Sequence, residues 1–139
     1  GDEVAPVCLG VFENRLGGRV AVSGYAPWTM VHSRAKVAQL KALFRWLSRD
    51  DLEAFVASFH RASLWVGAGA GGHRVSVLVN ASIDRARGLV VALRGEISEV
   101  TYIGRDLSER RLSPSGRDGT HTLFPLPEMD SWDTGLLLG

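Results

Sequence analysis

The chain has 139 residues and a formal net charge of +1 at pH 7, with 45% hydrophobic and 22% charged residues. This length and composition allow a hydrophobic core without disulfides, while the small net charge argues against nucleic acid and membranes as partners. The single cysteine, Cys8, excludes an internal disulfide and a thiolate metal cluster. No apolar run reaches the roughly 18 residues that a membrane-spanning helix needs. No signal peptide is recognised, so we expect a cytoplasmic location.

The first predicted element is a short strand over residues 19–23 (RVAVS). Glycines bound this apolar run, which indicates a buried strand. Gly17 and Gly18 precede the strand, whereas the glycines of a phosphate-binding loop follow one, and no phosphate-loop motif occurs after it. The two glycines therefore predict a tight hairpin rather than a nucleotide site.

A helix is predicted over residues 33–48, because apolar residues recur there at spacings of three and four. These residues are Val37, Leu40, Phe44 and Leu47. Ser33 is the expected N-cap, and residues 48–51 (SRDD) are expected to end the helix.

Two interpretations remain open for residues 52–60. The spacing of Leu52, Phe55, Val56 and Phe59 fits a helix. Phenylalanine and valine are also strand formers, however, and similar residues continue to Val66. We favour an extended segment with a bend.

Beyond residue 66, short alternating apolar runs are separated by clusters of glycine, proline and serine, including turns at 67–72 and 114–120. The alternation places the following sets on one face of a strand each: Val75, Val77 and Val79; Leu89, Val91 and Leu93; Thr122, Phe124 and Leu126; Trp132, Thr134, Leu136 and Leu138. The pattern is typical of an antiparallel sandwich. The predicted fold class is α+β, with a short N-terminal strand–loop–helix segment (1–50) followed by a small antiparallel β-sandwich-like domain (51–139).

No motif supports catalysis or a cofactor. The acidic residues are scattered and form no evident pair of the kind that a glycosidase uses. The four histidines, His32, His60, His73 and His121, lie at no metal-ligand spacing. We therefore predict no catalytic residue, no metal and no cofactor for this chain.

Exposed aromatic residues are the remaining candidates for ligand contacts, because aromatic faces can stack on sugar rings. Trp46 lies in the predicted helix and Trp65 in an apolar run, so both are expected in the core. Trp28, Trp132 and Tyr25 are the possible sugar-contacting residues. Asn80 begins an Asn-Ala-Ser sequon, which we interpret as a turn.

Four motifs in a fixed order carry a resemblance to a known family: FENRLGGRVAVSGYAPW, RAKVAQLKALFRWLS, VSVLVNASIDRARGLVVALRG and LFPLPEMDSW. Together they resemble the C-terminal region of multidomain, bacterial β-galactosidase-type glycoside hydrolases over residues 11–138. In that family a (β/α)₈ catalytic barrel is followed by a flavodoxin-like domain, often used for trimerisation, and by a closing antiparallel β domain. The resemblance implies that residues 1–50 close the flavodoxin-like domain and that residues 51–139 form the β domain. It covers no part of the barrel, so it provides no catalytic or sugar-binding residue.

Three functions follow as hypotheses. The first is a non-catalytic accessory region of a glycoside hydrolase, whose partner is the remainder of the parent enzyme or another copy in a homo-oligomer. The second is a free-standing carbohydrate-binding module, and the third is a small enzyme with an unrecognised site. The first predicts exposed apolar surface, especially along the edges of the first strand.

Overall fold

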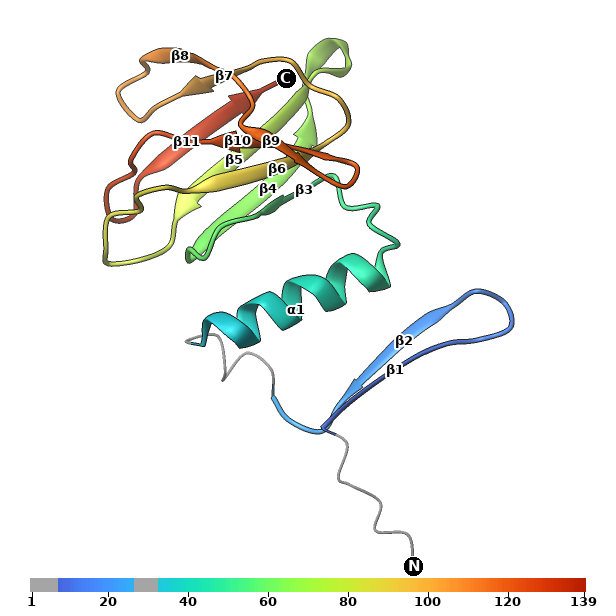
Figure 1. Ribbon diagram of the computed structural model, residues 1–139. Coiled ribbons are helices and arrows are strands. Elements are labelled where there is room, and N and C mark those ends of the chain that lie inside the picture. The colour runs from blue at the N-terminus through green and yellow to red at the C-terminus, as the bar shows by residue number, and fades with distance from the viewer. Residues whose placement is uncertain (1–7, 27–32) are drawn as a thin grey trace, which may run out of the picture. The chain divides into compact units, whose positions relative to one another are not determined.

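The computed structural model describes residues 8–26 and 33–139. Figure 1 shows a hairpin and a helix followed by layered strands. The chain divides into two compact units, Gly1–Asp51 and Leu52–Gly139. The predicted fold class is confirmed: the fold is α+β, with a strand pair and one helix, and then antiparallel sheets packed as a β-sandwich-like domain.

The first unit begins with an antiparallel hairpin of β1 (Leu9–Glu13) and β2 (Arg19–Ser23). The Asn14 side-chain Oδ1 accepts hydrogen bonds from the backbone N–H groups of Leu16 and Gly18 and so orders the turn. Gly17 adopts a φ of 81°, which favours glycine. The predicted strand and hairpin are thus confirmed.

The prediction that β2 is buried is wrong. Val20 and Val22 are exposed, and β1 is the one strand that pairs with β2 in the described chain. A two-stranded sheet has no third strand or second layer to cover its apolar side chains. The apolar run was therefore a correct signal for a strand but not for its burial within this unit.

The helix α1 spans Arg34–Leu47, close to the predicted range. Ser33 occupies the N-cap position with an extended backbone, although its side chain makes no capping hydrogen bond. The helix ends where Arg49 and Asp50 adopt left-handed backbone angles. Asp50 also pairs with Arg45 at 2.6 Å (Nε to Oδ1), so the SRDD segment ends the helix as expected.

Polar contacts join the helix to one face of the hairpin. The Arg19 guanidinium donates from Nη1 to the Trp46 carbonyl at 2.6 Å and lies 5.0 Å from the Trp46 ring centroid. The Glu13 carboxylate accepts hydrogen bonds from Arg19 (2.9 Å) and Arg49 (2.8 Å), and these two arginines hold the pKa of Glu13 below its ordinary value, Arg49 most strongly. The prediction that Trp46 is a core residue is wrong, since no residue of α1 is buried.

The second unit contains two antiparallel sheets. The four-stranded sheet has the order β3 (Ala54–Val56), β6 (Val90–Arg94), β10 (His121–Pro125), β9 (Gly116–Asp118). The five-stranded sheet has the order β4 (Ala62–Ala68), β5 (Arg74–Asn80), β11 (Thr134–Leu138), β7 (Val100–Ile103), β8 (Glu109–Leu112). A short 3₁₀ turn, η2 (Ala70–Gly72), joins β4 to β5.

Residues 52–60 contain strand β3 and no helix, so the favoured extended interpretation is confirmed. The buried His121 anchors the start of this segment, because its Nε2 lies 2.7 Å from the Leu52 carbonyl oxygen and its ring packs edge-on against Phe55. A carbonyl can only accept, so Nε2 carries the proton. Strand β9 falls inside the predicted 114–120 turn, which is a departure from the prediction.

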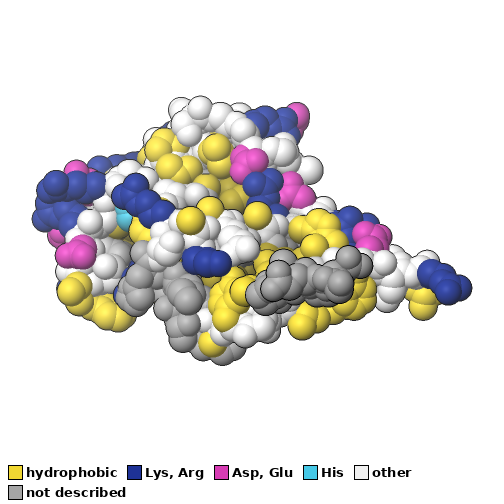
Figure 2. Space-filling model, turned by 60° about the horizontal axis from the view of Figure 1, so that its bottom comes forward, with side chains coloured by type: hydrophobic (Ala, Val, Ile, Leu, Met, Phe, Trp, Pro, Cys, Tyr) yellow, Lys and Arg dark blue, Asp and Glu magenta, His cyan; other side chains and the backbone are white. Residues whose placement is uncertain are grey.

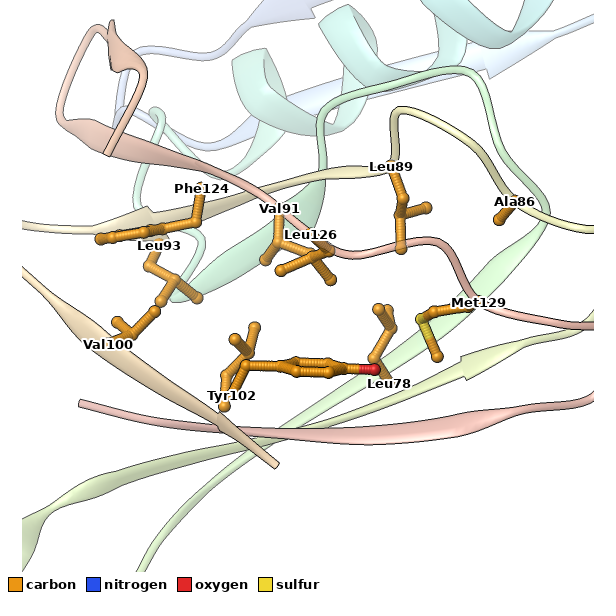
Figure 3. Close-up of a cluster of buried hydrophobic side chains, with 11 residues drawn as sticks. Leu78, Ala86, Leu89, Val91, Leu93, Val100, Tyr102, Phe124, Leu126 and Met129 are labelled. Carbon is orange, nitrogen blue, oxygen red and sulfur yellow. The ribbon is translucent and has the colours of Figure 1, made fainter. Parts of the chain in front are cut away.

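The core lies between the two sheets. Figure 3 shows Leu89, Val91 and Phe124 on one side of it and Leu78, Val100 and Tyr102 on the other. The prediction that Leu89, Val91 and Leu93 share one face is confirmed, as is the alternation of Phe124 and Leu126, and both faces point inward. Both sets come from β6 and β10 or the residues beside them.

The inward faces of β5 and β11 are the opposite of those suggested by their aliphatic stripes. In β5 the buried residues are Ser76, Leu78 and Asn80, while in β11 they are Gly135 and Leu137. The aliphatic stripes instead lie on the outer face of the sheet. They consist of Val75, Val77 and Val79 in β5 and of Leu136 and Leu138 in β11, and Val77 pairs with Leu136 and Val75 with Leu138. In β5 the alternation itself favours the wrong face, because its three valines lie outward while two of its three buried residues, Ser76 and Asn80, are polar.

Candidate functional site

The three predicted sugar-contacting residues do not form a described aromatic platform. Trp28 lies outside the described residues. Tyr25 belongs to the first unit, where its hydroxyl lies 3.2 Å from Gln39 Oε1 and the Lys36 ammonium lies 4.9 Å from its ring centroid. Trp132 belongs to the second unit and is 63% exposed. Neither unit therefore holds two of these residues in its described part.

Trp132 is positioned by the end of β5. Its backbone N–H donates to the Asn80 carbonyl at 3.0 Å, and the Asn80 N–H donates to the Asp133 carbonyl at 2.9 Å. The Asn80 side chain is buried and donates from Nδ2 to the carbonyls of Asp84, Met129 and Asp130. The sequon asparagine thus holds two loops together, although it is the last residue of strand β5 and not a turn residue as interpreted from the sequence.

A cavity of about 630 Å³ lies next to this segment and is named here the tyrosine pocket. The end of β7, the β7–β8 turn and β8 line one part of it, and the segment that precedes β11 lines the rest. The lining residues are Tyr102, Gly104, Arg105, Asp106, Ser108, Arg110, Pro127, Glu128 and Asp133. Residues far apart in the sequence therefore meet at one polar site.

Tyr102 belongs both to the lining of the pocket and to the hydrophobic core. It is only 5% exposed, and its hydroxyl is the one oxygen among the core side chains drawn in Figure 3. Its ring lies across Gly135, where a Cβ atom would come within 2.4 Å of the ring and 2.7 Å of the hydroxyl. The missing side chain of Gly135 makes room for this tyrosine.

The charges around Tyr102 are nearly balanced. Burial raises the pKa of Tyr102 above its ordinary value, and the Asp133 and Asp106 carboxylates add to this while Arg110 opposes it. The hydroxyl therefore stays protonated at neutral pH. Asp106 accepts hydrogen bonds from the Ser108 hydroxyl (2.6 Å) and N–H (3.1 Å), which lower the pKa of this carboxyl, so Asp106 is ionised.

Several polar groups of the pocket are not used by the rest of the protein. Within the described chain, the Tyr102 hydroxyl makes no hydrogen bond, and Arg105 and Arg110 form no ion pair. Glu128 differs, because it lies 3.6 Å from Arg85 and 3.5 Å from Arg87. The pocket thus presents donors from arginine, acceptors from aspartate and one hydroxyl that can do both.

A second kind of candidate site is an uncovered apolar face of the hairpin. The register places Phe12, Val20 and Val22 on one face, opposite the face whose Glu13 and Arg19 contact α1. All three apolar side chains are exposed, Phe12 by 54%. Figure 2 shows hydrophobic side chains reaching the molecular surface in several places.

The outer face of the five-stranded sheet is apolar as well. The register aligns Trp65, Val77, Leu136 and Ile103 across β4, β5, β11 and β7. The two sheets pack through their inner faces, so within the second unit this row lies on the outside. Trp65 is 58% exposed, and its prediction as a core residue is wrong because β4 is an edge strand whose Trp65 side chain points outward.

From the sequence, Tyr102 is one of the aromatic residues that could stack on a sugar ring, but it was not chosen as a site residue, and no other residue of the tyrosine pocket was predicted to bind a ligand. Two local signals were present: a glycine inside the last strand, which is typical of a close approach by another group, and the Asp106-x-Ser108 turn after β7. Neither signal shows that the two segments meet.

Among residues 8–26 and 33–139, no group of three His, Cys, Asp or Glu side chains is arranged to hold a metal ion. Cys8 is exposed and free. None of the helices in the described part of the chain has the length and hydrophobicity needed to cross a membrane.

Comparisons with protein-family models, with curated proteins and with solved structures give no match to this chain. The class of protein that can be stated is therefore the fold: an α+β chain with a β-sandwich-like second unit.

Proposed function

We propose that this chain is a non-catalytic accessory region of a glycoside hydrolase-like protein, and that it acts by packing against other parts of that protein. The observation that carries the proposal is an apolar sheet face with exposed side chains in each unit: Phe12, Val20 and Val22 in the first, and Trp65 in the second. Surfaces of this kind mark interaction sites, because the removal of apolar surface from water is favourable by about 25 cal/mol for each Å² that is buried.

The apolar face of the hairpin is the better supported of the two candidate interaction surfaces. An isolated two-stranded sheet is marginally stable, and this hairpin combines open edges with exposed Phe12, Val20 and Val22. We propose that the preceding part of the parent's flavodoxin-like domain covers this face. The order of the four sequence motifs, which resembles the end of β-galactosidase-type hydrolases, supports that occupant.

The alternative of a carbohydrate-binding module built on Trp28, Trp132 and Tyr25 has less support. Tyr25 already bonds Gln39 and faces Lys36, and Trp132 stands in the other unit. A flat platform requires two aromatic faces side by side, and neither unit has them in its described part.

Self-association tests the apolar faces. Without its natural neighbour the full chain should associate with itself at rising concentration, as measured by size-exclusion chromatography with light scattering. Phe12→Ser and Trp65→Ser should each weaken association about tenfold, since burial of a large apolar side chain contributes about 1.5–3 kcal/mol.

Matched control variants distinguish association through these two faces from non-specific hydrophobic association. Leu16 (96% exposed, at the hairpin turn) and Ile83 (84% exposed, in a loop) lie off the two faces, so Leu16→Ser and Ile83→Ser should leave association unchanged. A full chain that stays monomeric at all concentrations would contradict the proposal. A second test is the reading frame upstream of residue 1, which should encode a barrel with paired glutamates.

A further inference from the structure

We infer that strand β4 pairs edge to edge with β4 of a second copy of this chain, so that the five-stranded sheets of two copies join into one antiparallel sheet. The inference deepens the packing proposal, on which it rests for the premise that Trp65 lies on an interaction surface, and it names the partner of that surface. Three observations carry it: the uncharged edge of β4, its unpaired backbone groups and the self-complementary order of its residues.

Among the strands at the sheet ends in the described chain, β4 alone is both long and uncharged. The two sheets end in β3, β9, β4 and β8. Strands β3 and β9 have three residues each, and three of the four residues of β8 are charged. Short or charged edge strands resist pairing with another chain. By contrast, β4 has seven residues, ASLWVGA, and none of them is charged, so its edge can accept a further strand.

The backbone of β4 presents a row of unused hydrogen-bonding groups along this edge. Successive residues of an antiparallel strand bond to opposite sides. Arg74 and Asn80, the end residues of β5, bond to the residues that flank β11, so the odd-numbered residues of β5 bond toward β4, where odd-numbered residues face them. The N–H and C=O groups of the even-numbered residues of β4 therefore point away from β5, and they make no hydrogen bond within the described chain. These residues are Ala62, Leu64, Val66 and Ala68.

One antiparallel register pairs all four of these residues with a second copy. It sets Ala62 opposite Ala68 and Leu64 opposite Val66, and a two-fold axis perpendicular to the sheet repeats both pairs. Each pair exchanges two backbone hydrogen bonds, because its groups face the partner strand. Apolar residues meet apolar residues throughout, and β4 has no charge that would face a like charge. The edge is therefore complementary to itself.

The same register places Trp65 on the two-fold axis, opposite the second copy's Trp65. This pair lies on the outer face of the sheet and is of the non-hydrogen-bonded kind, in which the side chains lie closest. Aromatic pairs across strands are stabilising, and Trp65 is 58% exposed in the single chain. On either side of the axis, Ser63 faces Gly67, and these small residues leave room for the indole rings. The exposed tryptophan thus becomes the centre of an interface between two copies.

Charge substitutions of Trp65 in the full chain test the two-fold arrangement, because only a residue on the axis meets its own copy. Trp65→Lys and Trp65→Glu, each alone, set like charges opposite each other and should weaken dimerisation at least about tenfold in light scattering. An equimolar mixture of the two variants should regain the dimer, and native mass spectrometry should show that it contains one chain of each kind. Leu107→Lys, at an exposed position between β7 and β8, is the matched control and should leave dimerisation unchanged.

Amide hydrogen exchange on the unmodified full chain tests the backbone pairing. The N–H groups of Leu64 and Val66 should exchange fast in dilute protein and at least about tenfold more slowly where the dimer forms. The N–H groups of Trp65 and Gly67 are the internal control, because they bond toward β5 within the chain. Their exchange should hardly depend on protein concentration.

Three outcomes would overturn the inference while the packing proposal stands. The first is that both Trp65 variants lose association and their mixture does not regain it, which would place Trp65 against a different surface. In the second, Phe12→Ser abolishes association and both Trp65 variants retain it, so that the hairpin face alone associates. The third is exchange at Leu64 and Val66 that stays independent of concentration in a protein that associates.

The packing proposal can also fail by itself. An upstream reading frame without a catalytic barrel would contradict the proposed parent enzyme and would leave the β4 pairing intact. A full chain that stays monomeric at all concentrations would contradict both.

Discussion

At the scale of single residues, Tyr102 and Gly135 depend on each other. The tyrosine ring crosses β11 directly over Gly135, which has a regular strand conformation and needs no special backbone angle. Packing, not backbone freedom, is therefore the reason that glycine suits this position. The close packing also directs the Tyr102 hydroxyl toward the pocket.

The substitution Gly135→Ala should destabilise the second unit by about 1–3 kcal/mol, which is typical of an overpacked core. The new Cβ would lie 2.4 Å from the Tyr102 ring, and the ring is buried and cannot simply swing away. Urea unfolding followed by circular dichroism measures the change. Gly67→Ala is the control, since Gly67 lies in β4 with no atom near its Cβ position, and its effect should stay within about 0.5 kcal/mol. Equal midpoints for the two variants would contradict the packing argument.

At the scale of elements, the end of β5 organises the loops around the pocket. Asn80 links the 81–86 loop to the segment before β11 through three hydrogen bonds from one amide nitrogen. The Ala86–Met129 backbone pair and the Arg85–Asp130 ion pair join the same two segments. Trp132 and Asp133 are bonded to the Asn80 backbone. The local sequence predicts a turn at this position, but not that a distant segment closes over it.

The substitution Asn80→Asp should destabilise the protein by about 3 kcal/mol or more, because it replaces a buried donor with a charged acceptor that faces carbonyl oxygens. Thermal and urea unfolding measure the loss. Asn14→Asp is the matched control and should leave the unfolding midpoint nearly unchanged. Asn14 Oδ1 acts only as a hydrogen-bond acceptor, and aspartate retains this acceptor. A similar midpoint for both variants would show that the Asn80 amide is not a structural donor.

At the scale of the whole molecule, stability is concentrated in the second unit. Every residue of the buried hydrophobic cluster lies within residues 78–137, whereas no described residue of the first unit is buried. A chain segment without a core cannot offset its loss of conformational entropy. The first unit therefore depends on burial beyond its own side chains, in line with the packing proposal.

A fragment of residues 52–139 should fold by itself, with a β-type circular dichroism spectrum and one cooperative urea transition. A fragment of residues 1–51 should show no cooperative transition, because it has no buried residue in its described part. Cooperative unfolding of the shorter fragment, or an unfolded longer one, would contradict this assignment of stability.

The sequence by itself determined the element order, the hairpin, the helix from Ser33 onward and most strands of the second unit. These features depend on near neighbours: apolar spacing, glycine at a positive φ and turn residues act within a few positions of the chain. The alternation around β6 and β10 also grouped Leu89, Val91 and Leu93, and Phe124 and Leu126, on shared faces, and these faces point inward.

Only the tertiary structure decided which faces of β5 and β11 point inward, where Trp46 and Trp65 lie, and that Tyr102 meets Asp133 beside a cavity. The physical reason is that the local pattern favours the opposite orientation: the aliphatic stripes of β5 and β11 lie outward, while Ser76, Asn80 and Gly135 lie on the buried faces. The pairing with Ile103, Trp65 and Tyr102 across the sheet selects the observed orientation. A pocket formed by segments about thirty residues apart has no local signature, because its geometry exists only once the sheets have packed.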